Sequence, residues 1–168
     1  MGDVMQRMWI MGLLAFLLSL MGCDGQRIAE LEEGVSTEAD VTARFGVPDK
    51  TWAESDGGRT LEYSRQPAGH RNYMITIGPD GRMTALRQVL TPANFARVQP
   101  GMAIEDVLRR LGRPMKVSPW PLKKETGYDW RFLDDNNTSQ IFTVYVDTSG
   151  EVRRTGITPD PETAEQRR

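Results

Sequence analysis

A short phrase that ends a predicted helix occurs twice in this chain. "RFGVP" at residues 44–48 is matched by "RLGRP" at residues 110–114. In each copy an apolar residue precedes a glycine, which favours the left-handed backbone that ends a helix, and the proline two positions later prevents the helix from resuming. The residues that we expect to act as helix stops, without a chemical role, are Gly46, Pro48, Gly112 and Pro114.

The segments before the two phrases have helical patterns. Thr37 can cap the first helix, and Asp40 stands where a capping box needs its acidic partner. In the second copy, apolar residues at positions 104, 107, 108 and 111 fall on one helical face. Shorter helices are expected upstream at 26–33 and 92–98. Each copy is therefore predicted to open with two short helices.

Strand patterns follow both phrases. Counting back from the turns "PDG" and "TSG", Tyr73, Ile75 and Ile77 align with Phe142, Val144 and Val146 on one face of a period-two pattern. Further strands are expected at 50–53, 60–64, 115–118 and 127–133. This order predicts an α+β fold of two tandem repeats, each with two short helices packed on a small antiparallel β-sheet. The expected divisions are 1–22 signal peptide, 23–90 repeat 1, 91–157 repeat 2 and 158–168 disordered tail.

The start of the chain has the character of an export signal. Residues 8–21 carry no charge, and this apolar stretch is too short to span a bilayer comfortably. It fits the apolar region of a secretory signal peptide, with translation beginning at Met1, Met5 or Met8. Gly22 and Cys23 follow directly, and Cys23 is the one cysteine of the chain. The fold can therefore contain no intramolecular disulfide.

The sequence "LMGC" at residues 20–23 resembles the lipobox of bacterial lipoproteins. The resemblance implies cleavage before Cys23, acylation of that cysteine with lipid such as palmitate, and a membrane-anchored chain that faces the periplasm. A secreted protein with an incidental cysteine is the alternative. Asp24 bears on the membrane, because enterobacterial lipoproteins with aspartate at this place tend to stay in the inner membrane. Inner and outer membrane both stay open.

The segment "GVSTEADVTARFGVP", the strand "LEY" and the hairpin "ITIGPDGRM" resemble the BamE-like (SmpA/OmlA) lipoprotein domain, and "GMAIEDVLRRLGRP" with "YDWRF" resembles it again. The family implies a non-enzymatic scaffold or adaptor at the outer membrane. Its expected partners are envelope proteins, including subunits of the machine that assembles outer-membrane β-barrels. The tandem arrangement is also similar to the β-lactamase inhibitory proteins, so a periplasmic inhibitor or ligand-binding module is the alternative.

Charge and residue types argue against several other functions. The net charge is −2, and without a long basic run nucleic acid is not an expected partner. His70 is the one histidine and is expected to be solvated in a loop, while Asp134 and Asp135 are typical of a polar turn. No metal, cofactor or catalytic residue is predicted.

Binding is the remaining function, and the aromatic residues suggest where. Trp120 stands between two prolines, which would stiffen a loop that presents it, although it could instead cover an edge of the core. Trp52 and Trp130 are expected to pack on the sheets. If the two sheets join into one concave face, that face would also be lined by Tyr145, Thr143, Thr76 and Met74. The candidate partner-binding residues are Trp120, Tyr145 and Met74.

Overall fold

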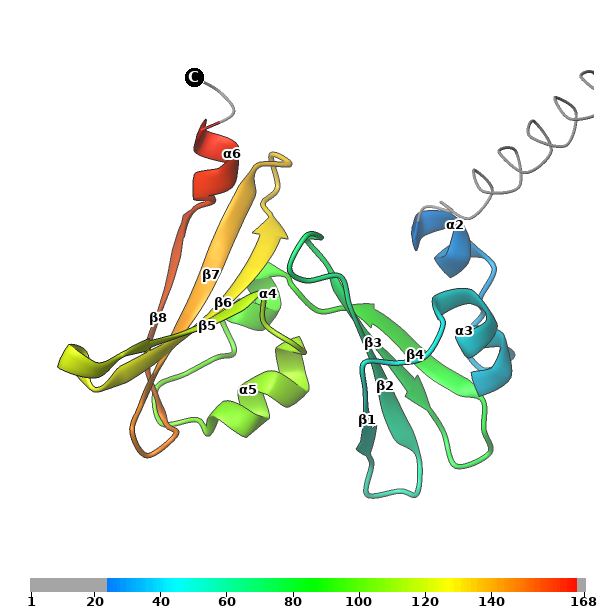
Figure 1. Cartoon of the computed structure of the whole chain (residues 1–168). Coiled ribbons are helices and arrows are strands. Elements are labelled where there is room, and N and C mark those ends of the chain that lie inside the picture. Colours follow the sequence, from blue (N-terminus) through cyan, green and yellow to red (C-terminus); the bar gives the residue numbers. More distant parts are fainter. Residues whose placement is uncertain (1–23, 166–168) are drawn as a thin grey trace, which may run out of the picture.

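The computed structural model describes residues 24–165, which form two antiparallel four-stranded sheets with short helices (Figure 1). Unit 1 comprises α2 (Asp24–Ala29), α3 (Glu38–Phe45), β1 (Lys50–Ala53), β2 (Arg59–Ser64), β3 (Asn72–Ile77) and β4 (Met83–Gln88). Unit 2 comprises α4 (Pro92–Phe95), α5 (Ile104–Leu111), β5 (Lys116–Trp120), the 3₁₀ turn η1 (Pro121–Lys123), β6 (Glu125–Leu133), β7 (Ser139–Asp147), β8 (Val152–Pro159) and α6 (Pro161–Glu165).

Each unit is a meander with helices on one face. The strand orders are β1-β2-β3-β4 and β5-β6-β7-β8. In Figure 1 the layers follow one another as α2 and α3, the sheet of unit 1, α4 and α5, and the sheet of unit 2. Helix α5 therefore lies between the two sheets. We call the face of each sheet that points away from its own unit's helices the outer face.

The helix ends follow the sequence signals. The Thr37 hydroxyl accepts a hydrogen bond from the Asp40 N–H, and the Asp40 carboxylate accepts one from the Thr37 N–H, which completes the predicted capping box. Gly46 and Gly112 follow the last residues of α3 and α5 with φ of +85° and +75°. Both glycines therefore stand at helix ends in a backbone conformation that few other residues adopt cheaply.

Apolar side chains of the helices and strands meet in two cores. In unit 1, Val41 and Phe45 of α3 pack on alternating residues of β2 and β3, and the Phe45 ring lies 5.1 Å from that of Tyr63. In unit 2, Phe95 of α4 stacks 4.1 Å from Phe142. The remaining buried members of the second core include Ile104, Val107, Leu111, Trp130, Phe132, Val144, Val146 and Val152. The predicted placement of Trp130 is thus confirmed.

Corresponding backbone hydrogen bonds tie the helices of each unit to its last strand. Gly34 N–H donates to the Met83 carbonyl in unit 1, and Gly101 N–H donates to the Val152 carbonyl in unit 2. Each sheet also has a register shift at an aligned place, after Thr76 and after Tyr145. The α+β fold with two repeats is therefore as predicted.

The end of the chain differs from the prediction. Residues 158–165 are not a disordered tail, because β8 continues to Pro159 and α6 follows. Burial holds this segment: Asp160 is 1 % exposed and paired with Arg131. The sequence did not reveal this, because the segment is polar and has no apolar periodicity, and because the buried residue, Asp160, is charged. The predicted signal peptide and Cys23 lie outside the described residues, and within 24–165 no helix is long and apolar enough to cross a membrane.

Candidate functional site

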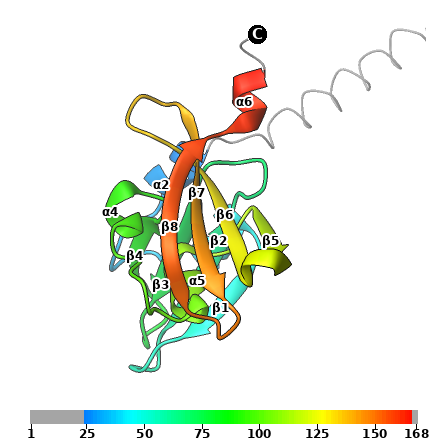
Figure 2. The same ribbon diagram turned by 90° about the vertical axis from the view of Figure 1, so that its left-hand side faces the viewer.

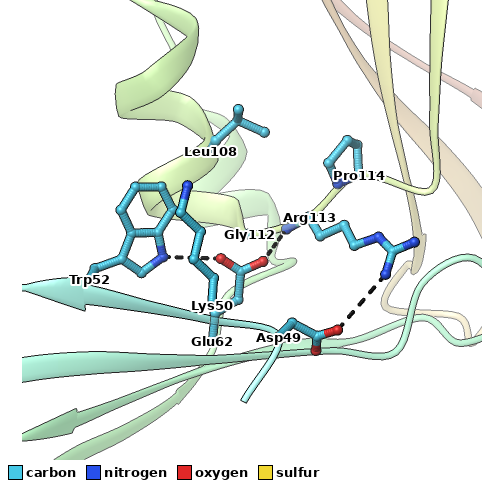
Figure 3. Close-up of a pocket in the computed structure, with 8 residues that line it drawn as sticks. All are labelled: Asp49, Lys50, Trp52, Glu62, Leu108, Gly112, Arg113 and Pro114. Carbon is cyan, nitrogen blue, oxygen red and sulfur yellow. Dashed lines mark hydrogen bonds and ion pairs between the residues drawn. The ribbon is translucent and has the colours of Figure 1, made fainter. Parts of the chain in front are cut away.

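The outer face of the unit 1 sheet is occupied by unit 2. Glu62 in β2 is 3 % exposed, and its carboxylate accepts hydrogen bonds from the Trp52 indole N–H at 3.0 Å and from the Arg113 backbone N–H at 2.6 Å (Figure 3). Asn72 in β3 donates its side-chain amide to the carbonyls of Leu111 and Arg113, at 2.8 and 3.0 Å. These contacts clamp the chain where α5 ends.

Gly112 fits this clamp because it has no side chain. A Cβ there would lie 3.1 Å from both the Asn72 amide nitrogen and a Glu62 carboxylate oxygen, and 3.2 Å from the terminal methyl of Met74. At Gly46, the matching position of unit 1, a Cβ would meet nothing within 4 Å. Gly112 therefore serves both as a helix stop and as a point where the two units approach closely.

The hypothesis that the two sheets join into one concave face is wrong. The two sheets are separate, and α5 lies between them (Figure 1). Met74 is 7 % exposed and faces Gly112, so the structure places this candidate inside the chain's own junction. The strand pattern identified which face Met74 occupies, but it carried no information on whether the neighbouring unit covers that face.

A pocket of about 280 Å³ opens at the edge of the junction, between Trp52, Leu108 and Pro114 (Figure 3). The Lys50 ammonium lies 3.6 Å from the centre of the Trp52 ring, and the Arg113 guanidinium lies 3.8 Å from Asp49. Both Glu62 carboxylate oxygens already accept hydrogen bonds from the chain itself. The pocket is thus the mouth of a structural junction, with its central carboxylate already engaged.

The outer face of the unit 2 sheet is open. Residues directly opposite in antiparallel strands share a face, so the pairings place Tyr145 beside Gly127 and Arg154, and Asp129 beside Thr143. Figure 2 shows β5 to β8 with no other element of residues 24–165 lying over them, apart from α6 at one end. This face contains two of the three candidates, Trp120 and Tyr145.

An aromatic and cationic cluster occupies one edge of the open face. The rings of Trp120 and Tyr145 meet edge to face, with centres 5.6 Å apart. The Arg154 guanidinium lies 3.4 Å from the centre of the Tyr145 ring and pairs with Glu125 at 2.8 Å. The Lys123 ammonium lies 4.8 Å from the Trp120 ring. Cation–π contacts of this kind restrict the positions of the two rings.

Trp120 is not in a loop. It is the last residue of β5, and it remains 38 % exposed. Pro119 is tolerated there because β5 is an edge strand, where a missing N–H costs no ladder hydrogen bond. Trp52 is half-buried on β1, where it contacts Glu62 and Lys50.

The open face is hollowed between β5 and α6, with a volume of about 430 Å³. At its far end Arg131 pairs with Asp160 at 2.8 Å and with Glu162 at 2.6 Å. Although burial acts to raise it, the pKa of Asp160 is lowered by hydrogen bonds from Ser139 and the Glu162 N–H and by Arg131. The hollow therefore has aromatic rings at one end and, at the other, Arg131 paired with two carboxylates.

A second seam joins the units through the loop between β2 and β3. Gln66 exchanges hydrogen bonds with the backbone of Arg131, and His70 Nε2 lies 2.9 Å from the Ser139 hydroxyl. Because Ser139 donates to Asp160, the His70 ring nitrogen is the donor to Ser139. Burial, followed by the charge of Arg131, lowers the pKa of His70. The expectation that His70 is solvated is therefore wrong, because unit 2 closes over one side of the loop.

The acidic turn is built as expected from the sequence. Asp134 accepts hydrogen bonds from the N–H groups of Asn136 and Thr138 and from the Gln140 amide. These bonds lower the pKa of Asp134, that from Thr138 most of all. Within residues 24–165 no group of three or more histidine, cysteine or acidic side chains could hold a metal ion.

Sequence reasoning missed Glu62 and Arg131, two charged residues that contact the other unit across the seams. Both stand at strand positions that alternate with apolar residues, which ordinarily predicts a solvated face. The sequence held one relevant signal. By strand alternation, Glu62 and Arg131 each fall on the face of the sheet that is opposite the apolar core.

Comparison with known proteins gives limited likenesses. No protein-family model matches the chain, and no curated protein matches it. Among solved structures, it is similar to one described as the osmotically inducible lipoprotein OsmE, with 27% identity over 42% of this chain and 73% of the other, at a TM-score of 0.35. It is also similar to the DUF4309 family protein YjgB from Bacillus subtilis, with 18% identity over 78% and 83% of the two chains, at a TM-score of 0.30. TM-scores this low assign neither fold nor function to the chain.

Proposed function

We propose that this protein is a non-enzymatic envelope lipoprotein that binds a protein partner through the open outer face of its second sheet. The observation that carries the proposal is the difference between the two outer faces. The first is filled by α5 and its following loop, whereas the second leaves the Trp120 and Tyr145 rings accessible over a shallow hollow. Exposed, fixed aromatic rings beside arginine are typical of binding hot spots.

The anchor half of the proposal is supported by the sequence alone. An uncharged stretch at residues 8–21 is followed by Cys23 in the lipobox-like "LMGC". Acylation would hold the chain at a membrane surface on the periplasmic side, the outer membrane by family resemblance. The scaffold or adaptor role, with barrel-assembly subunits as the partners sought first, comes from that same resemblance.

The test is affinity purification of the acylated protein after mild crosslinking in cells, with bound proteins identified by mass spectrometry. We expect recovery of envelope partners that is lost in Trp120→Ala. Val47→Ala is the matched control, because Val47 is 91 % exposed and lies on the other unit. Cys23→Ala separates partners that need the anchor from those that do not.

The result also distinguishes the alternative function. Recovery of one soluble enzyme with both the acylated and the Cys23→Ala forms would indicate an inhibitor. Recovery that is unchanged by Trp120→Ala would contradict the assignment of the binding face.

A further inference from the structure

The residue that follows the expected lipidation site is fixed to the folded unit. Asp24 begins α2, and its carboxylate accepts two hydrogen bonds from the Arg65 guanidinium, at 3.1 and 3.0 Å. The side chains of Asp24 and Arg65 are 22 % and 27 % exposed. Paired guanidinium and carboxylate groups of this geometry are held in both position and orientation.

Arg65 is itself held by the core of unit 1. Its guanidinium lies 5.6 Å from the centre of the Phe45 ring and 5.9 Å from that of Tyr73. Further along, Ile28 of α2 packs against the same core. Asp24 is therefore connected to the rigid body of the protein by a side-chain pair and by the helix that it begins.

Because Asp24 is fixed to unit 1, no flexible linker separates Cys23 from the folded part of the chain. Consecutive Cα atoms are about 3.8 Å apart, so Cys23 lies within one residue of the Asp24 and Arg65 pair. A flexible linker of twenty residues would instead allow an average separation of about 25 Å. An acyl chain on Cys23 would consequently enter the bilayer beside the loop between β2 and β3.

We propose that this end of the molecule, which we call the anchor end, rests directly on the membrane surface. The proposal rests on the proposed function, because it requires acylation of Cys23. In Figure 1 three segments lie at this end of the molecule: the start of α2, the loop between β2 and β3, and the turn between β6 and β7. The turn at residues 148–150 projects toward the opposite end.

The chemistry of the anchor end fits the headgroup layer of the bilayer. A hollow of about 620 Å³ opens there, lined by Asp24, Gly25, Arg65, Ala68, Gly69, His70, Arg71 and Leu133. None of the large exposed apolar side chains lines this hollow; they are Val35, Val47, Val117, Trp120, Leu122 and Ile157. A surface made mainly of small and polar or charged residues, with Leu133 as its one large apolar residue, would contact polar headgroups without entering deeply into the hydrocarbon region. The strands of the unit 2 sheet run from the anchor end to the opposite end, so its open face stands upright beside the bilayer (Figures 1 and 2).

The test measures which end of the molecule approaches lipid headgroups. Ala68→Cys and Thr148→Cys each introduce one exposed thiol, at the anchor end and at the opposite end. The acylated proteins, labelled with a bimane fluorophore, are reconstituted in phosphatidylcholine vesicles with and without a nitroxide on the headgroup. We expect several-fold stronger quenching at position 68 than at 148.

Breaking the anchor contact should reduce that difference. Asp24→Asn weakens the pair with Arg65, which frees the start of α2, so quenching at position 68 should fall toward that at 148. Glu30→Gln is the matched control, because it removes a different ion pair of the same region, that with Arg44. Equal quenching at 68 and 148 in acylated protein that floats with the vesicles would overturn the docking and leave the anchor intact. A chain that does not acquire lipid and does not float would overturn the proposed function, and the docking with it.

Discussion

The outer faces of the two sheets are built from aligned positions, yet one is closed and the other is open. Glu62 on the first sheet occupies the place that Asp129 occupies on the second, and Met74 aligns with Thr143. Glu62 accepts one hydrogen bond from the other unit, from the Arg113 N–H, and one from Trp52 of its own sheet, whereas Asp129 accepts one from Thr143 of its own sheet. An acidic residue at one strand position can thus serve either a junction or an open surface.

The difference shows what the second unit contributes to the first. A lone unit of this size has a marginal core, and unit 2 adds to unit 1 a buried clamp around Gly112. The open face of unit 2 has no such cover within residues 24–165, and its charged groups are paired with one another instead. Substitutions at matched positions can therefore separate stability from binding.

The largest effect is expected from Glu62→Ala. The change leaves the Arg113 N–H and the Trp52 indole without their acceptor, at about 1 to 3 kcal/mol for each buried donor. We expect a loss of about 3 kcal/mol in the free energy of unfolding, measured by urea denaturation of the chain from residue 24. Asp129→Ala should cost about 1 kcal/mol or less. Equal losses at the two positions would remove the distinction between the faces.

Gly112→Ala should be the next most damaging change. The new methyl group would stand 3.1 Å from Asn72 and Glu62 at a residue with φ of +75°. Backbone strain of about 1 kcal/mol and overpacking of about 1 to 3 kcal/mol combine there. Gly46→Ala has the same kind of backbone but open space, so it should cost about 1 kcal/mol. Thermal unfolding of both variants checks the order, and a larger loss at Gly46 would contradict it.

Trp120→Ala should have little effect on the fold. The ring is 38 % exposed and its main aromatic contact is Tyr145, so we expect a loss of about 1 kcal/mol or less. Denaturation together with the partner assay checks this. A large loss of stability would mean that the ring covers the core rather than presenting a binding surface.

The smallest effect is expected from pH acting on His70. Its folded-state pKa is lowered from 6.5, so the unfolded chain binds more protons once the pH falls to about that value. The free energy of unfolding should therefore decline as pH falls from 7 to 5. The decline should be smaller in His70→Gln, measured at each pH by urea denaturation. An identical pH profile for both proteins would show that the seam with Ser139 is insensitive to this proton.

Short sequence patterns predicted the helices and strands, but they did not predict how the two units pack against each other. Thr37, Gly46 and Gly112 act through their own backbone and neighbours, so their roles are readable from short patterns. Met74 could be assigned to a face but not to a buried one, because α5 reaches it from a distant part of the chain. The burial of Asp160 escaped detection for the same reason, since its partner Arg131 is on another strand.

The most direct test compares the two outer faces at aligned positions in living cells. A photo-crosslinking residue replaces Tyr145 in one strain and Thr76 in another, and the products are separated by mass. The account predicts that position 145 captures a distinct envelope protein, while position 76 yields only crosslinks within the chain. Capture of that protein from position 76, or of none from position 145, would contradict it.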